Sequence, residues 1–287
     1  MDSDNALGSR SGDIDDGIAL AVLMRSGVEI EAVASVFGNT TGTQALANHR
    51  ALAEVCGWEG PCLAGANRAD DPATPAAEHL VGVPGARILL ALGPLTNVAQ
   101  ALRLRPRLAH EVDQLVCLGS NPASRGRWPP LWPFEFNFTK DRRALVQVFE
   151  SALPICVVPL SQARRMRVRF SDLSPVQGEL GAYLRLHARR WFRYARRAKL
   201  QSTVPVWDLV ATTLVTHPEL FRTDAVRARA HPSGWVEYGA GDRDVLLVQD
   251  FDPQEVWTRA VQTLNGCARP SAREAASTRT ERASEGA

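Results

Sequence analysis

Residues 87–104 read RILLALGPLTNVAQALRL, and this stretch decides the fold. The first six residues, apolar after Arg87, have the length of a buried strand, which Gly93 and Pro94 end. From Leu95 onward the apolar residues recur at helical spacing. A buried strand that turns directly into a helix is the repeating unit of an α/β fold with a mainly parallel sheet.

The same alternation extends outward from this stretch in both directions. We expect further strands at 30–37, 61–64, 115–118 and 155–160, and further helices at 18–25, 44–56, 76–81 and 141–149. Beyond residue 160 the pattern predicts helices at 176–199, 206–216 and 253–264, with antiparallel strands within 226–249. The prediction is a mainly parallel sheet flanked by helices, with a C-terminal helical and antiparallel portion.

We make a separate prediction for each end of the chain. Residues 1–267 are predicted to form a single domain, and residues 268–287 a disordered tail, because the tail lacks large apolar side chains. At the other end, a buried strand should lead into the first aspartates, yet Met1 directly precedes Asp2. We therefore expect the first strand to be missing or the true start to lie upstream.

Composition narrows the class of protein. The formal net charge of +2 over 287 residues gives no field that would recruit nucleic acid or an anionic membrane. The arginines within 189–197 have the spacing of a solvated helix face. The five cysteines lack paired spacing, which suits a reducing cytoplasm, and no apolar run approaches the length of a membrane helix. A cytoplasmic protein without nucleic-acid or membrane partners is predicted.

Five aspartates, Asp2, Asp4, Asp13, Asp15 and Asp16, lie close together near the N-terminus. So many carboxylates repel one another unless protons or a cation neutralise them, and Ca²⁺ suits oxygen ligands in irregular geometry. An aspartate that caps the following helix would account for one of the five aspartates, but not for all of them. A phosphatase of the haloacid-dehalogenase type also uses Asp-x-Asp, whereas the spacing of an EF-hand loop is not met.

The order of motifs resembles the inosine-uridine preferring nucleoside hydrolases. The opening Asp-x-Asp, a glycine loop and Asp-x-Asp-Asp are followed by three further matching segments and a distant acidic pair. These are Val36-Phe37-Gly38-Asn39, residues 90–97 (LALGPLTN), residues 134–138 (FEFNF) and Trp207-Asp208. The resemblance covers about residues 2–264 and implies the Rossmann-like fold of that family, a nucleoside substrate, and assembly as a dimer or tetramer.

The resemblance also implies roles for single residues. Asp4 would be a Ca²⁺ ligand and the general base, Asp15 a second catalytic residue that binds a ribose hydroxyl, and Asp16 and Asp208 further Ca²⁺ ligands. The backbone carbonyl of Leu92 would complete the metal site.

Substrate-binding roles fall on four other residues. Asn39, Glu135 and Asn137 would bind the ribose hydroxyls, and Trp207 stands where many members have a general-acid His. An indole could stack on a purine and assist its departure, or Trp207 could simply be a core residue at a helix start.

Two further departures concern the side of the pocket that holds the base. The family's His-Gly loop is absent, because residues 65–87 are short and polar, and His79 is expected to be a surface or packing residue. Trp128 and Trp132 lie in a loop that is either a stacking wall or a stiff Pro/Trp segment. Two hypotheses follow: a Ca²⁺-dependent hydrolase of ribonucleosides, purines favoured, or a catalytically weak or inactive homologue that binds nucleoside or ribose.

Overall fold

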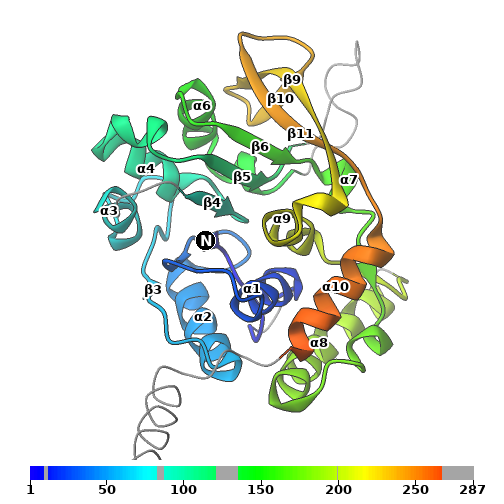
Figure 1. The fold of residues 1–287 in the computed structure, drawn as a ribbon. Helices are drawn as coiled ribbons and strands as arrows, with labels where there is room; N and C mark the ends of the chain where they lie inside the picture. Colours follow the sequence, from blue (N-terminus) through cyan, green and yellow to red (C-terminus); the bar gives the residue numbers. More distant parts are fainter. Residues whose placement is uncertain (10–11, 83–86, 121–134, 199, 267–287) are drawn as a thin grey trace, which may run out of the picture.

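A mainly parallel sheet runs through the protein, with the strand order β10-β9-β11-β6-β5-β4-β1-β2-β3 (Figure 1). The computed structural model describes residues 1–9, 12–82, 87–120, 135–198 and 200–266. The strands of the sheet are β1 (Asp2–Ser3), β2 (Val33–Ser35), β3 (Cys62–Leu63), β4 (Ile88–Ala91), β5 (Gln114–Leu118), β6 (Ile155–Val158), β9 (Phe221–His231), β10 (Trp235–Tyr238) and β11 (Arg243–Phe251). The predicted α/β class is confirmed.

Helices cover both faces of the sheet (Figure 1). One face carries α1 (Asp15–Arg25), α2 (Gly42–Cys56), α8 (Gly178–Ala198), α9 (Trp207–Thr216) and α10 (Pro253–Asn265). The other carries α3 (Pro75–Gly82), α4 (Thr96–Leu104) and α6 (Arg142–Glu150). Each of these helices overlaps a predicted one. The strands alternate between the two layers: in β5, Val116 and Leu118 pack into the first core and Leu115 and Cys117 into the second.

Shorter elements complete the chain. They are α5 (Asn137–Lys140), α7 (Leu160–Ala163), a separate antiparallel pair of β7 (Arg167–Val168) and β8 (Val204–Pro205), and 3-10 turns at Pro106–His110, Phe170–Leu173 and Pro218–Leu220. None of the helices in the described ranges combines the length and the hydrophobicity that a bilayer-spanning helix requires. The predicted tail, 268–287, lies outside the described residues.

The first strand, expected to be missing, is present as the two-residue β1. It lies between β4 and β2 and is parallel to both. The amide of Ala34 donates to the carbonyl of Met1 at 2.7 Å, and the amide of Leu92 donates to the carbonyl of Asp2 at 2.8 Å. These bonds on both edges make a very short strand part of the sheet.

The predicted antiparallel strands are present, and they join the main sheet. Strands β9 and β10 are antiparallel as expected, and β11 also pairs in parallel with β6 and so joins the main sheet.

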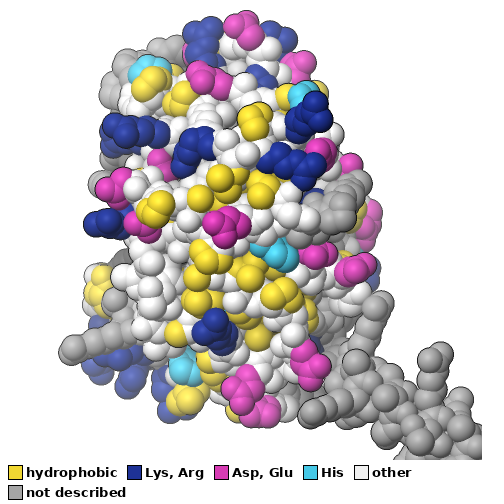
Figure 2. Space-filling view, turned by 90° about the vertical axis from the view of Figure 1, so that its left-hand side faces the viewer, with side chains coloured by type: hydrophobic (Ala, Val, Ile, Leu, Met, Phe, Trp, Pro, Cys, Tyr) yellow, Lys and Arg dark blue, Asp and Glu magenta, His cyan; other side chains and the backbone are white. Residues whose placement is uncertain are grey.

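On the flank that carries α3 and α4, hydrophobic side chains gather in the middle of the surface with charged side chains around them (Figure 2). The predicted arginine-rich face of α8 is solvated, because Arg189, Arg190, Arg193, Arg196 and Arg197 are all exposed.

Candidate active site and metal centre

The site lies at the carboxyl ends of the central parallel strands. Asp4 follows β1, Asn39 comes soon after β2, and Leu92 directly follows β4. Because neighbouring parallel strands end at the same edge of a sheet, residues distant in sequence meet there. Gly38 permits the closest approach, since a Cβ at this position would lie 2.0 Å from the Asp4 carboxylate.

Three aspartates form a compact acidic group at this edge. One carboxylate oxygen from each of Asp13, Asp15 and Asp16 lies within 4.8 Å of the others, so the three could hold a metal ion. Asp15 and Asp16 are the first residues of α1, which begins three residues earlier than predicted. Negative charge is favourable at a helix N-terminus, and this partly offsets the mutual repulsion.

Asp4 and Asp208 add their charges to this group. Burial raises the pKa of Asp208 well above its ordinary value, and the charges of Asp16, Asp15 and Asp4 raise it further. Burial followed by the charge of Asp16 has the same effect on the pKa of Asp4. The fold thus brings Asp208, in the first turn of α9, to the N-terminal aspartates.

The polar atoms present fit a cation. Oδ1 of Asp15 and Oδ2 of Asp16 are buried and make no hydrogen bond within the described parts of the chain. The other oxygen of Asp16 accepts from the hydroxyl of Ser3 at 2.6 Å, which fixes the carboxylate. Buried carboxylate oxygens without donors are costly unless a cation or proton satisfies them. This donor set of hard oxygens suits a divalent cation such as Ca²⁺.

Asp2 does not belong to this group, although the sequence placed it there. Its carboxylate accepts from Nδ2 of Asn97 at 2.9 Å. Burial raises the pKa of Asp2 to about 7, and the bond from Asn97 and the charge of the Met1 amino group oppose the shift. Asn97 also donates to the carbonyl of Ser35 and accepts from the amide of Ala66, so it ties three strand ends together. Asp2 is a structural residue of β1, which also removes the basis for the phosphatase alternative.

A cavity of about 540 Å³ opens over the acidic group. Every predicted substrate-binding residue lines it: Asn39, Glu135, Asn137 and Trp207. Asp13, Asp15 and Asp208 line the same cavity, as does Leu92. A larger hollow of about 710 Å³ lies elsewhere, beside α4 and α6, and contains none of these residues. The predicted substrate-binding residues therefore share one concave site with part of the acidic group, whereas the predicted metal ligands Asp4 and Asp16 are not among its lining residues.

Three of the predicted residues have tasks within the protein itself. Asn137 donates from Nδ2 to the carbonyls of Leu92 at 2.8 Å and Leu118 at 3.0 Å, which joins the ends of β4 and β5. Glu135 accepts from the amides of Phe138 and Thr139 and thereby caps α5. Burial raises the pKa of Glu135 to about 8, with these amides opposing the shift. The carbonyl oxygen of Leu92, which accepts from Asn137, keeps a second lone pair that can bind a cation.

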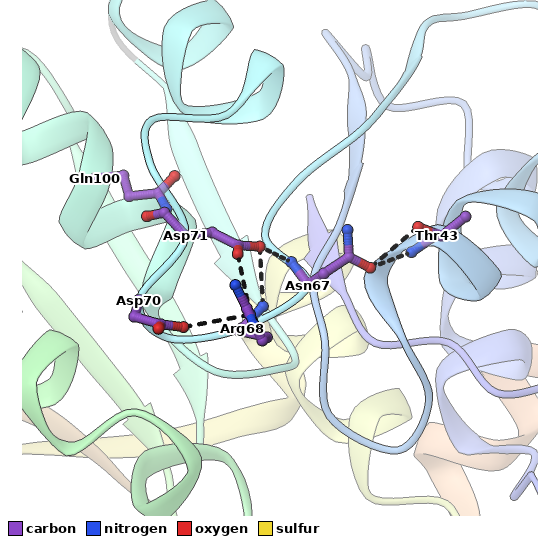
Figure 3. A network of polar contacts seen from close by, with 6 residues as sticks. All are labelled: Thr43, Asn67, Arg68, Asp70, Asp71 and Gln100. Carbon is purple, nitrogen blue, oxygen red and sulfur yellow. Dashed lines mark hydrogen bonds and ion pairs between the residues drawn. The ribbon is translucent and has the colours of Figure 1, made fainter.

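The loop that departs from the family forms a closed polar network (Figure 3). The side chain of Asp71 accepts from the amides of Asn67 and Arg68, and Asn67 in turn accepts from Thr43. No described residue of this loop lines the cavity. His79 also lies outside it, with Nε2 4.0 Å from a carboxylate oxygen of Glu31. Trp128 and Trp132 fall outside the described residues.

Sequence reasoning missed several residues of the site. Ser3 could have been noticed, because it stands between two aspartates of the opening motif. Asp13 belonged to the cluster but was given no role. Arg164, Arg167 and Trp191 line the cavity as well, and no motif marks them, because the fold alone brings α7, β7 and α8 to the site.

The pH dependence of stability tests the electrostatics of the metal-free protein. Burial, then the charge of Asp13, raises the pKa of Asp16 to about 7, and the pKa of Glu135 is about 8. Between about pH 4 and 7 the folded state therefore binds more protons than the unfolded chain, so the free energy of unfolding falls as pH rises. We expect the melting temperature in a chelator to be higher at pH 5.5 than at pH 8. A melting temperature that rises with pH over this range would contradict the assignment.

Comparison with known proteins places the chain in a family. The family model for inosine-uridine preferring nucleoside hydrolases matches residues 11–265. A non-specific ribonucleoside hydrolase, RihC, of Salmonella enteritidis is 30% identical over 164 residues, which are 56% of this chain and 51% of that protein. The alignment thus spans about half the length of the curated relatives.

Solved structures agree on the fold. A plant nucleoside hydrolase has a TM-score of 0.79 at 21% identity, covering 93% of this chain and 98% of its own. A purine-preferring ribonucleoside hydrolase from Gardnerella vaginalis has a TM-score of 0.76 at 17% identity, covering 92% and 98%. With the family model matched over most of its length, this chain belongs to the inosine-uridine preferring nucleoside hydrolase family.

Proposed function

We propose that this protein hydrolyses the N-glycosidic bond of ribonucleosides to ribose and free base, with Ca²⁺ as its cofactor. The observation that carries the proposal is the acidic group of Asp13, Asp15 and Asp16, of which Asp13 and Asp15 line the 540 Å³ cavity. Family membership supports the reaction class, and the names of relatives, which include non-specific and purine-preferring ribonucleoside hydrolases, support the substrate class.

The residues that would hold Ca²⁺ are Asp4, Asp16, Asp208 and the carbonyl of Leu92. Their support is the electrostatic coupling among the three aspartates and the position of Leu92 at the end of β4. Bound Ca²⁺ supplies a positioned water with a lowered pKa. Asp13 is a candidate for the same site, because its carboxylate lies with those of Asp15 and Asp16.

The chain's own groups would carry out the remaining steps. Asp4 takes a proton from the attacking water, and Asp15 holds a ribose hydroxyl close to the reacting carbon. Asn39, Glu135 and Asn137 bind the other hydroxyls, with Oδ1 of Asn137 left for a ligand because its Nδ2 is occupied. As positive charge develops on the ribose, the nearby carboxylates stabilise it.

Trp207 would contact the base, and its replacement gives a test of base preference. Its half-buried ring packs against the core and also lines the cavity. Stacking on a base contributes about 1–3 kcal/mol. We expect Trp207→Ala to lower kcat/KM for inosine by about 10- to 100-fold and for uridine by much less, while Trp207→Phe retains most activity.

Steady-state kinetics on the two nucleosides check this prediction. Equal losses for inosine and uridine in Trp207→Ala would assign the indole to the core and remove the stacking role.

A second function has its own support. The cavity lacks a contribution from the 65–74 loop, and Trp207 stands in place of a general-acid histidine. These two departures favour a homologue that binds nucleoside or ribose and turns it over weakly or not at all. Thermal stabilisation by inosine without release of reducing sugar would select this alternative.

Two expectations about the molecule in solution accompany the proposal. The hydrophobic gathering on the α3–α4 flank supports association of chains into a dimer or tetramer (Figure 2). The described cysteines are free thiols, which supports a reducing, cytoplasmic location. Light scattering during size-exclusion chromatography measures the first directly.

A further inference from the structure

The lining of the cavity over the acidic group also includes residues of a different chemical character. Four of them come from the end of α7, β7, α8 and the segment before β8: Arg164, Arg167, Trp191 and Gln201. Trp207 and Asp208 line the same cavity. The acidic residues suit a cation and ribose hydroxyls, so the aromatic and cationic residues are left for the base of a bound nucleoside. This step rests on the proposed function.

Arg167 is exposed, and hydrogen bonds join its side chain to the segment before β8. Its Nε donates to the hydroxyl of Thr203 at 2.9 Å, and its Nη2 donates to the carbonyl of Thr203 at 2.9 Å and to the side chain of Gln201 at 3.3 Å. Across the β7–β8 pair it lies opposite Pro205. These bonds use one edge of the guanidinium and leave Nη1 without a partner in the described part of the chain.

The same framework ties Arg167 to the site of reaction. The amide of Val206 donates to the carbonyl of Met166 at 3.0 Å. This bond joins the residue before Arg167 to the residue before Trp207, and Asp208 follows directly. The backbone around this bond therefore positions the guanidinium of Arg167, the indole of Trp207 and the carboxylate of Asp208.

The chemistry of the reaction creates a need for a cation here. As water oxygen bonds to C1′ of the ribose, the C1′–N bond breaks and its electron pair goes to the base nitrogen. The proton of the water passes to a carboxylate, and the base leaves as an anion that takes a proton from solvent. No described histidine lines the cavity to protonate the base within it.

We propose that Arg167 is the residue that stabilises the departing base, by placing its fixed positive charge and free N–H groups against the negative charge that develops on the ring. A donor aimed at a developing charge contributes more than one that binds ground and transition states equally. Arg164, at the end of α7, adds a second cation to the lining of the cavity.

Arg165 provides a matched control from the same turn. It donates to a carboxylate oxygen of Asp250 at 2.6 Å and to the carbonyl of Phe251 at 2.9 Å, and it does not line the cavity. Arg165→Gln removes the same charge two residues away from Arg167. Any effect of overall charge or of general loosening near α7 will appear in this variant.

The kinetic test compares leaving groups. Inosine releases a base that needs stabilisation, whereas p-nitrophenyl riboside releases a phenolate that leaves without help. We expect Arg167→Gln to lower kcat/KM about 100-fold for inosine and less than about 5-fold for the nitrophenyl riboside. Arg167→Lys should recover part of the loss, and Arg165→Gln should match the parent on both substrates.

Other results would overturn the proposal. Equal losses on the two substrates would mean that Arg167 only positions Trp207 and Asp208, and undiminished inosine hydrolysis would exclude any role. If the parent protein cleaved the nitrophenyl riboside but not nucleosides, the proposed ribose-binding residues would be supported. Activation of the base by Arg167 would be rejected.

A binding measurement keeps the test independent of turnover. Between the pKa of xanthine and the higher pKa of hypoxanthine, xanthine is anionic while hypoxanthine is neutral. By calorimetry the parent protein should bind the xanthine anion about tenfold more tightly than hypoxanthine, and Arg167→Gln should abolish this preference. If the parent protein hydrolyses nothing, the proposed function fails and so does the catalytic role of Arg167, whereas this preference would still show that Arg167 binds an anionic base. A parent protein without the preference contradicts it.

Discussion

Asp16→Asn is expected to raise the Ca²⁺ concentration needed for half-maximal activity by at least about 100-fold. The substitution keeps the size of the side chain and an oxygen for the hydroxyl of Ser3, but it removes one of the buried charges that would hold the cation. The measurement is initial rate against free Ca²⁺ in a metal buffer.

The same substitution should make the metal-free protein more stable. In the absence of a cation, burial raises the pKa values of Asp16 and Asp4, and the charge of Asp13 on Asp16 and that of Asp16 on Asp4 raise them further. Removing one such charge relieves about 1 kcal/mol, which corresponds to about 2–4 °C in melting temperature. The exposed Asp113→Asn serves as the control and should change neither quantity. A variant that is destabilised without metal and keeps its Ca²⁺ requirement would contradict the assignment.

Asp4→Asn is expected to lower kcat by about 10³-fold at saturating Ca²⁺. An amide retains an oxygen that can face a cation but has no capacity to accept a proton from water, and loss of a general base costs about 10²–10⁴-fold. The backbone amide of Asn39, which donates to Oδ2 of Asp4, can still be satisfied by the amide oxygen. The fold should therefore survive, which circular dichroism would confirm.

Together the two variants separate binding from chemistry. Asp16→Asn should shift the Ca²⁺ dependence and recover rate at high Ca²⁺, whereas Asp4→Asn should lose rate that Ca²⁺ does not recover. If Asp4→Asn retained the parental kcat, another residue would have to act as the base.

Local patterns in the sequence were enough for the alternation of strands and helices. The run at 87–104 became β4 and α4, and the predicted boundaries elsewhere differ from the observed ones by a few residues. Strand β1 was not foreseen, because a two-residue strand has no periodicity and exists only through its bonds to β2 and β4. The pairing of β11 with β6 joins segments about 90 residues apart and leaves no local signal.

The residues of the candidate site likewise fall into those that the sequence predicts and those that only the fold reveals. Residues within recognisable motifs, such as Asp15, Asn39 and Asn137, line the cavity that the motifs predicted. Asp2 was misplaced, because spacing alone does not reveal that its partner is Asn97 on a distant helix. Arg167 lies in no motif, and only the β7–β8 pairing brings it to the site.

The most direct test of the central claim is release of reducing sugar from a panel of inosine, adenosine, uridine and cytidine. Each nucleoside is incubated with the chelator-treated protein, with and without added Ca²⁺. We predict that ribose and free base appear in equal amounts with Ca²⁺, that the chelated protein is inactive, and that Ca²⁺ restores the rate. Absence of release from every nucleoside at high protein concentration, or release that is indifferent to chelation, would contradict it.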